Sequence, residues 1–195
     1  MKKIFQKRLL LLILPALLFS GCAAADSQEK TAAGSTPETE AASSSKQEEN
    51  SMQIDFESTD MDGNSVSSDV FSESELTMVN VWATYCNPCL NEMPGLGELS
   101  GAYDPKEFQI IGIISDVQEG ADSDTMALAS NLIAQTNADY THLLLNESLY
   151  LGLLTDVTAV PTTFFIDKNG AILDTVVGAM EQSAWEEKIN ALLEE

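Results

Sequence analysis

Two apolar runs, at residues 77–82 and 109–114, constrain the fold more than any other feature of this sequence. Each consists mainly of aliphatic side chains, with a length and composition typical of a buried strand. Between them, a helical pattern extends from Cys86 towards Ser100. Because a strand, a helix and another strand follow one another, the sequence predicts an α/β domain.

Turn signals predict a hairpin on each side of this unit. Asp-Gly and Asn-Gly pairs between short apolar segments favour tight β-turns. The first hairpin is expected at 54–58 and 64–67, around Asp62-Gly63, and the second at 162–167 and 172–177, around Lys168-Asn169-Gly170.

Apolar residues at helical spacing predict further helices at 123–136 and 149–154, with a short strand at 142–145 between them. The last helix is expected to open with an S-x-x-E capping box, formed by Ser183 and Glu186. Strands alternate with helices before a closing hairpin and helix, which predicts a mixed central sheet flanked by helices. The apolar stripe expected on the last helix consists of Trp185, Ile189 and Leu192.

Residues 1–21 have the features of an export signal peptide. Four basic residues precede an apolar run at 9–19, which is too short for a typical membrane span. The run ends in Phe19-Ser20-Gly21-Cys22, which resembles a bacterial lipobox, and this resemblance implies that Cys22 becomes the lipid-modified N-terminus. An A-x-A site at Ala23-Ala24-Ala25 is a competing cleavage point for ordinary secretion.

Residues 22–52 are expected to comprise the lipidated cysteine and a disordered tether. Residues 26–51 contain mostly Ser, Thr, Ala, Glu and Gln and no aromatic residue, so they cannot bury enough apolar surface to offset the entropy of ordering. A globular domain is then expected over 53–195.

The charge of the chain excludes some classes of partner. Nine Lys and Arg residues against 31 Asp and Glu give a net charge of −22. Without the leader, five basic residues remain and the charge becomes −26. Nucleic-acid binding needs basic residues for phosphate contacts, and so does a patch that grips anionic lipid, so neither is expected.

The motif Cys86-Asn87-Pro88-Cys89 carries the clearest chemical signal. At the start of a predicted helix, unpaired N–H groups and a partial positive charge stabilise a thiolate at Cys86. A thiolate is the attacking species in disulfide exchange, and Cys89 can resolve the mixed disulfide. The alternatives are a zinc half-site, which needs a second ligand pair, a structural disulfide, which constrains little in so short a loop, and two buried thiols.

Two segments resemble thioredoxin-like proteins. Residues 82–94 are similar to the family's W-A-x-W-C-x-P-C-x-x-E-x-P stretch, and residues 159–167 to its V-P-T-T-F-x-I-D stretch. Within this family the chain is most similar to the extracytoplasmic TlpA/ResA branch, over 53–195. The resemblance implies a thioredoxin-like fold with an N-terminal hairpin and a central helical insertion around 120–140.

The same resemblance implies roles for individual residues. Cys86 corresponds to the nucleophile, Cys89 to the resolving thiol and Pro161 to a cis-proline that faces them. A cis bond there exposes the backbone of Val160 as a docking edge for a partner's cysteine.

Trp82 and Tyr85 are the expected substrate-contact residues beside the cysteines. Trp82 is equally compatible with a place in the core, because aromatic residues dominate cores. Tyr85 replaces the tryptophan that the family often carries there.

Two polar residues bear on proton transfer. Asn80 stands where cytoplasmic thioredoxins have a buried Asp, and an amide cannot act as a base. Glu92 matches a glutamate of the TlpA/ResA branch and is an i, i+3 neighbour of Cys89 on the predicted helix. A partly buried Glu92 with a raised pKa could accept the Cys89 proton. The alternative is a solvated surface carboxylate.

Other candidate sites have simpler explanations, and neither a metal nor a cofactor is expected. A calcium loop from Asp60 would need Glu at its twelfth position, which is Phe71. His142 is expected to be packed rather than catalytic. Helix capping and solvation account for the acidic residues Asp116, Glu119, Asp122 and Asp124.

These observations predict a lipid-anchored thiol–disulfide oxidoreductase on the extracytoplasmic face of a bacterial cell membrane. Its substrates would be disulfides of proteins outside the cytoplasm, and the resemblance implies re-reduction by a CcdA-like or DsbD-like membrane electron donor. Two alternatives remain open: an oxidant that forms disulfides with the same cysteines, and a redox-inert binding or chaperone-like lipoprotein of the same fold.

Overall fold

The computed structural model describes residues 54–194 of the chain. The predicted signal peptide, the predicted lipidation of Cys22 and the predicted tether lie outside the described residues.

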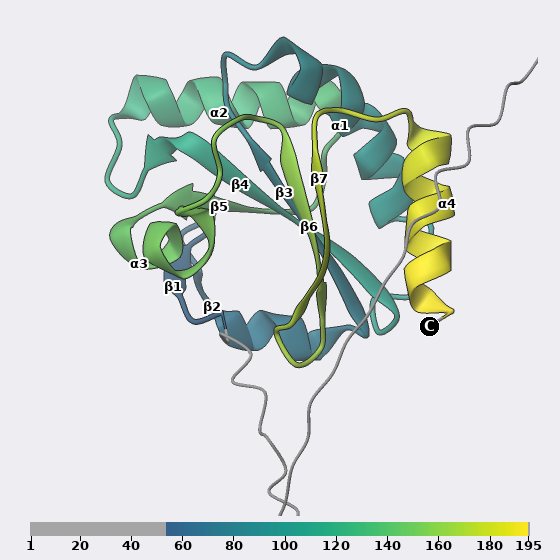
Figure 1. The fold of residues 1–195 in the computed structure, drawn as a ribbon. Helices are drawn as coiled ribbons and strands as arrows, with labels where there is room; N and C mark the ends of the chain where they lie inside the picture. Colours follow the sequence, from purple (N-terminus) through teal and green to yellow (C-terminus); the bar gives the residue numbers. More distant parts are fainter. Residues whose placement is uncertain (1–53, 195) are drawn as a thin grey trace, which may run out of the picture. The chain divides into compact units, whose positions relative to one another are not determined.

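A five-stranded mixed sheet forms the centre of the domain, in the order β5-β4-β3-β6-β7 (Figure 1). The parallel pairs are β3–β4 and β4–β5, whereas β6 is antiparallel to both β3 and β7. This confirms the predicted α/β fold with a mixed sheet. The strands are β3 (Leu76–Trp82), β4 (Phe108–Gln118), β5 (Thr141–Leu145), β6 (Thr162–Asp167) and β7 (Ile172–Val177).

Apart from η1 (Ser68–Glu73), which was not predicted, the helices and the N-terminal hairpin follow the predicted order. The hairpin strands are β1 (Glu57–Thr59) and β2 (Ser65–Ser67). The predicted segment at 149–154 begins earlier, as a short α3 (Glu147–Leu149) that continues into η2 (Tyr150–Leu154). The remaining helices are α1 (Asn87–Ser100), α2 (Ser123–Thr136) and α4 (Gln182–Leu193).

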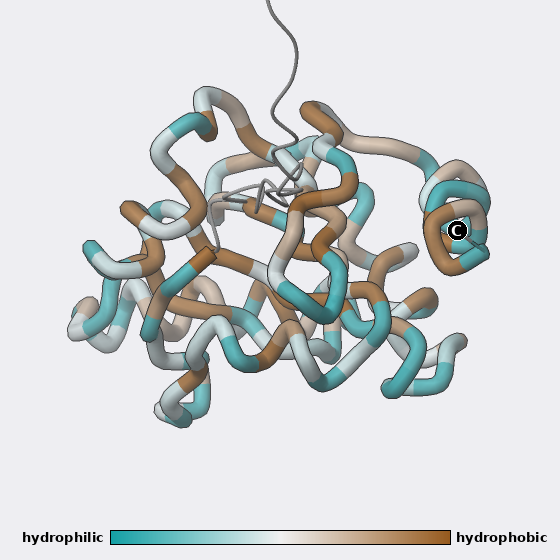
Figure 2. The backbone as a smooth tube through the Cα atoms, turned by 60° about the horizontal axis from the view of Figure 1, so that its bottom comes forward, coloured by the Kyte–Doolittle hydropathy of each residue, from teal (hydrophilic) through white to brown (hydrophobic). Residues whose placement is uncertain are grey.

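Alternate residues of β3 enter two different layers of core. On one face, Met78 and Trp82 pack beneath α1, α2 and α4. On the other, Val79 and Val81 pack against Phe71 of η1 and the α3–η2 segment. Figure 2 shows hydrophobic stretches through the middle of the domain and hydrophilic residues in many surrounding turns. Helix α1, which begins within the cysteine motif, contacts both α2 and α4 (Figure 1).

The start of α4 differs from the prediction. The N-cap is Glu181, in extended conformation (φ −71°, ψ 149°), and it makes no side-chain capping bond. Its carbonyl oxygen already accepts the first helical bonds, from the N–H groups of Ala184 and Trp185. Ser183 therefore lies inside the first turn, and the predicted capping box is wrong. Trp185 and Ile189 are fully buried, as the apolar stripe predicts.

Asp60, Glu119 and Asp122 accept hydrogen bonds from backbone N–H or hydroxyl groups. Asp60 accepts bonds from the N–H groups of Asp62 and Asn64 in the β1–β2 turn, and Asp122 caps α2. Glu119 accepts bonds from Thr59. Within residues 54–194, no group of three or more His, Cys, Asp or Glu side chains has an arrangement that could hold a metal ion. No helix in this part is long and apolar enough to cross a membrane.

Candidate active site

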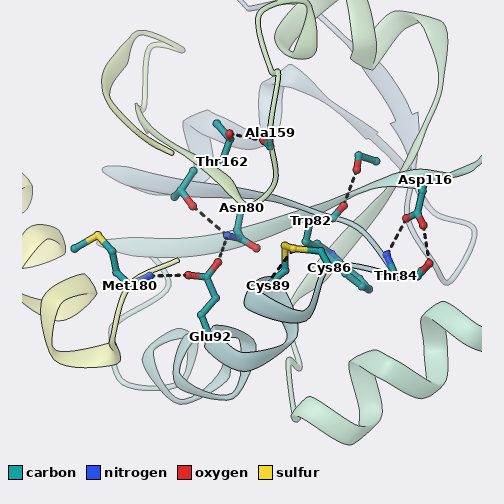
Figure 3. Close-up of a disulfide and its surroundings, with 12 residues drawn as sticks. Asn80, Trp82, Thr84, Cys86, Cys89, Glu92, Asp116, Ala159, Thr162 and Met180 are labelled. Carbon is teal, nitrogen blue, oxygen red and sulfur yellow. Dashed lines mark hydrogen bonds between the residues drawn. A yellow bond between two sulfur atoms is a disulfide. The ribbon is translucent and has the colours of Figure 1, made fainter. Parts of the chain in front are cut away.

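Cys86 and Cys89 form a disulfide at the N-terminus of α1 (Figure 3). Their Cα atoms are 5.3 Å apart. Cys86 is the N-cap of the helix, and its Sγ accepts a hydrogen bond of 3.2 Å from the N–H of Cys89. Cys86 is 6% exposed and Cys89 is completely buried, so only Cys86 is open to attack from outside.

The loop before α1 is held by hydrogen bonds from two sides. The N–H of Cys86 donates to the carbonyl of Ala83, which closes a turn directly after β3. The carboxylate of Asp116, on β4, accepts bonds from the N–H (3.0 Å) and the hydroxyl (2.6 Å) of Thr84. Pro88 lies in the first helical turn, where its missing N–H loses no bond. These contacts fix Cys86 at the helix terminus, where N–H groups stabilise negative charge on sulfur.

Trp82 lies fully buried in the same core cluster as both cysteines. Its Nε1 donates to Nδ1 of His142 at 3.1 Å, and the other ring nitrogen of His142 lies 3.0 Å from the carbonyl of Ala138. Nδ1 is therefore unprotonated and Nε2–H donates, so the imidazole is neutral. Burial lowers the pKa of His142 to about 4. Trp82 thus lies beside the disulfide and also in the core, and His142 is packed.

The other residues of the predicted site differ in how far they are exposed to solvent. Tyr85 is 74% exposed, immediately before Cys86. The Val160–Pro161 peptide bond is cis. Val160 is partly buried against the core cluster that contains both cysteines, and the carbonyl of Pro161 accepts a bond from Gly178. The fold therefore brings the start of the 159–167 segment to the core cluster that contains the disulfide, although many residues separate them in the chain.

Glu92 is buried, with 7% of its surface exposed, and its carboxylate accepts three hydrogen bonds. Oε1 accepts from Nδ2 of Asn80 at 3.0 Å. Oε2 accepts from the N–H of Met180 at 3.1 Å and from Nε1 of Trp185 at 3.2 Å. Figure 3 shows the carboxylate turned towards Asn80 and Met180. The alternative of a solvated surface carboxylate is therefore wrong.

Burial raises the pKa of Glu92, and the three donors only partly oppose this effect. A carboxylate of this kind can hold a proton at a higher pH than an exposed one, which suits a group that exchanges protons with a thiol. Sequence reasoning placed Glu92 near Cys89 but missed its partners Met180 and Trp185. A backbone N–H carries no sequence signal, and Trp185 was assigned only to the core.

The AhpC/TSA family profile matches residues 50–175. Among curated relatives, the thiol:disulfide interchange protein DsbE of Pseudomonas fluorescens is 34% identical over 114 residues, which cover 58% of this chain and 58% of DsbE. The thiol-disulfide oxidoreductase ResA of Bacillus cereus is 30% identical over 100 residues, covering 51% of this chain and 53% of ResA. The chain thus spans little more than half the length of these two relatives.

A solved structure shares the architecture. The crystal structure of a putative thiol:disulfide interchange protein DsbE from Chlorobium tepidum superposes with a TM-score of 0.59 at 27% identity. The match covers 72% of this chain and 95% of that one. The five-stranded mixed sheet with flanking helices is therefore a thioredoxin-like fold, as predicted.

Proposed function

The chain belongs to the AhpC/TSA family, and on that premise we propose that it is a thiol–disulfide oxidoreductase whose redox pair is Cys86 and Cys89. The observation that carries the proposal is the disulfide at the N-terminus of α1, where the Cys89 N–H donates to Cys86 Sγ. That bond and the helix dipole stabilise a Cys86 thiolate once the disulfide is reduced. The names of the DsbE and ResA relatives support the same chemistry.

Reduction of a substrate proceeds in two exchange steps. The Cys86 thiolate attacks one sulfur of the substrate disulfide, which forms a mixed disulfide and releases the other substrate sulfur as a thiolate. Cys89 then loses its proton and attacks Cys86 Sγ. The second substrate sulfur leaves as a thiolate, so the substrate gains two electrons and the enzyme pair is oxidised.

Neighbouring residues serve these steps. Glu92, one turn beyond Cys89 and buried, accepts the proton that Cys89 gives up. Tyr85 offers an exposed ring beside Cys86 for contact with the substrate. The backbone of Val160, ahead of Pro161, forms no hydrogen bond with residues 54–194 and is the docking edge for the substrate strand. Trp82 packs in the same core cluster as both cysteines and holds the cysteine motif in place.

The proposed direction is reductive, with disulfides of proteins outside the cytoplasm as substrates. Re-reduction of the pair requires a dithiol donor in the membrane, of the CcdA or DsbD type. The fold itself allows both directions, because pairs of this kind have potentials from about −270 to about −120 mV. Equilibration of the pair with glutathione or dithiothreitol buffers tests the direction. A potential near or below about −250 mV supports a reductant, and one near about −120 mV makes the chain an oxidant.

The proposed location is the outer face of the bacterial cell membrane, with Cys22 as the lipid anchor. A lipobox-like sequence at the end of the leader supports this location. Metabolic labelling with a palmitate analogue is expected to mark the full-length chain and to fail in Cys22→Ser. An unlabelled protein that begins after Ala25 would instead identify ordinary secretion.

The mechanism is tested by trapping. In Cys89→Ser the mixed disulfide cannot be resolved, so the variant should retain substrate proteins as covalent adducts that dithiothreitol releases. Cys86→Ser should trap nothing, because the attacking sulfur is gone. If neither variant traps a partner and the wild-type pair does not exchange with glutathione, the protein is a redox-inert binding module.

A further inference from the structure

In the side-chain amide of Asn80, both N–H groups are hydrogen-bonded and the carbonyl oxygen is not. Asn80 is completely buried on β3. Its Nδ2 donates one proton to Glu92 Oε1 and the other to Thr163 Oγ1, both at 3.0 Å. Its Oδ1 is buried and accepts no hydrogen bond from residues 54–194. An amide that leaves its only acceptor atom unpaired in a protein interior requires an explanation.

The present arrangement favours an ionised Glu92. All three groups that face this carboxylate are donors: the amide of Asn80, the N–H of Met180 and the indole N–H of Trp185. If the proton adds to the lone pair of Oε1 that faces Asn80 Nδ2, two hydrogens meet between these atoms, and the bond is lost. The two bonds at Oε2 are unaffected, so the conflict falls on Asn80 alone.

We propose that the Asn80 amide turns by half a revolution when Glu92 is protonated, and that it thereby satisfies both protonation states of the carboxyl group. In the turned state, Asn80 Oδ1 accepts the new O–H of Glu92. Its second lone pair accepts the hydroxyl proton of Thr163, because a threonine hydroxyl can donate as well as accept. The contacts that change with the protonation state of Glu92 are therefore those of Asn80 with Glu92 and Thr163, since Oδ1 gives up no bond in the present orientation.

Glu92 is the only buried carboxylate among the titratable side chains in this part of the structure. The titratable side chains that face it or share its pocket are Cys89 on α1, Tyr140 before β5 and Glu181 at the start of α4. Cys89 is held in the disulfide in the oxidised protein. Burial and the charge of Glu92 both raise the pKa of Tyr140, which therefore stays neutral. Glu181 is exposed and is solvated independently.

The catalytic consequence rests on the proposed function. Transfer of the Cys89 proton to Glu92 would leave a neutral acid among three donors if Asn80 were fixed. An amide that turns replaces the lost bond at once, which lowers the free-energy cost of holding the proton inside the domain. Asn80 is then a positioning residue that supports Glu92 as the base. Its own amide cannot accept the proton.

The turn of the amide is observable by NMR in the oxidised full-length chain, without any substrate. Lowering the pH should shift the Asn80 Cγ and Nδ2 signals with the same midpoint as Cδ of Glu92. The NOE from the Asn80 amide protons to the Thr163 methyl group should disappear over the same range. Asn169 is the matched control, since its amide also donates to a carboxylate, Asp167, but is exposed. Its signals should change at lower pH, because backbone and side-chain donors lower the pKa of Asp167.

The variant Asn80→Leu gives a second, quantitative test. A fixed amide stabilises only the ionised form, so its removal should raise the Glu92 midpoint by more than about one pH unit. An amide that turns stabilises both forms, and its removal should move the midpoint by less than about half a unit. Thr163→Val should move it as little. An NOE that persists through the titration, or a large shift in Asn80→Leu, would overturn the proposal.

These outcomes are independent of the trapping experiment. Adducts in Cys89→Ser together with a fixed Asn80 amide would leave the oxidoreductase intact and remove only this inference. A turning amide without adducts would leave the inference intact and remove the proposed activity.

Discussion

Among single residues, Glu92 combines burial with an acceptor role that no other described carboxylate near the disulfide has. In Glu92→Gln, the amide oxygen can keep the bonds from Met180 and Trp185, and the new NH2 group can donate to Asn80 Oδ1 when that amide turns, so the loss of stability should be about 1 kcal/mol or less. The variant cannot accept a proton. We expect its rate of disulfide reduction to fall about 100-fold near neutral pH and to lose the ionisation due to Glu92.

The measurement is the pH profile of reduction of a peptide disulfide. Glu98→Gln is the matched control, because Glu98 is on the same helix but is exposed and bonded only to Gln182. Its profile should match that of the wild type. An unchanged rate in Glu92→Gln would remove Glu92 from the proton-transfer step.

His142 predicts a pH dependence of stability. It is the only histidine in the chain, and burial lowers its pKa from 6.5 to about 4. The unfolded chain therefore binds a proton between these values while the folded protein does not. The contribution is fully present above pH 6.5 and is lost as the pH falls towards 4, by about 3 kcal/mol in all.

Glu92 opposes this trend, because its raised pKa lets the folded state keep a proton above pH 4.5, so stability falls as the pH rises from there. Urea unfolding of Glu92→Gln between pH 4 and 8 should therefore show a steeper rise with pH than the wild type. Adding His142→Asn to Glu92→Gln should make this rise of stability with pH less steep. A rise that survives in His142→Asn would assign the effect to another group.

Between elements, the contact of α1 with the end of α2 depends on one glycine. A Cβ atom on Gly97 would lie 2.2 Å from the carbonyl oxygen of Asn137, which is backbone and cannot rotate away. Asn137 ends α2 in the left-handed region, at φ 51°. In an exposed helix Gly→Ala usually stabilises, by about 1 kcal/mol. Gly97→Ala should instead destabilise by about 1–3 kcal/mol, since the two elements must separate.

Gly101→Ala is the comparison for this prediction. Gly101 ends the same helix at φ −87°, and its Cβ would meet only the Glu98 carbonyl oxygen, at 3.8 Å. Chemical unfolding of both variants should give effects of clearly different size. Equal stability of the two would show that α1 and the α2–β5 connection can shift apart at little cost.

Most elements could be predicted from the sequence, because strand runs and helical stripes are local patterns. The end of β4 could not, since Ser115 and Asp116 interrupt its apolar run although pairing continues to Gln118. The cysteine motif could also be predicted from the sequence, because its chemistry depends on residues close together in the chain. The network around Glu92 was not, because Asn80, Thr163 and Met180 come from three distant segments that only tertiary packing joins.

At the scale of the whole molecule, negative charge dominates. The chain has 31 acidic and nine basic residues. The lysines of the described part are Lys106, Lys168 and Lys188, and the last two are paired with Glu75 and Asp174. Such a surface creates a long-range negative potential, which raises the local concentration of cationic partners and repels acidic ones. Partner choice should therefore depend on charge before any contact forms.

This argument predicts how substrate charge and salt change the rate of mixed-disulfide formation. Two peptides with the same disulfide, one flanked by lysines and one by glutamates, are mixed with the reduced protein at low and high ionic strength. At low salt the lysine peptide should react at least about 10-fold faster, because steering of this kind changes association rates by about 10- to 1,000-fold. At about 1 M salt the Debye length falls to about 3 Å, and the two rates should converge.

Reaction with an uncharged disulfide controls for salt effects on the Cys86 thiolate itself. Rates that differ equally at both salt concentrations would mean that short-range contacts beside Tyr85, and not the field of the whole molecule, select the substrate.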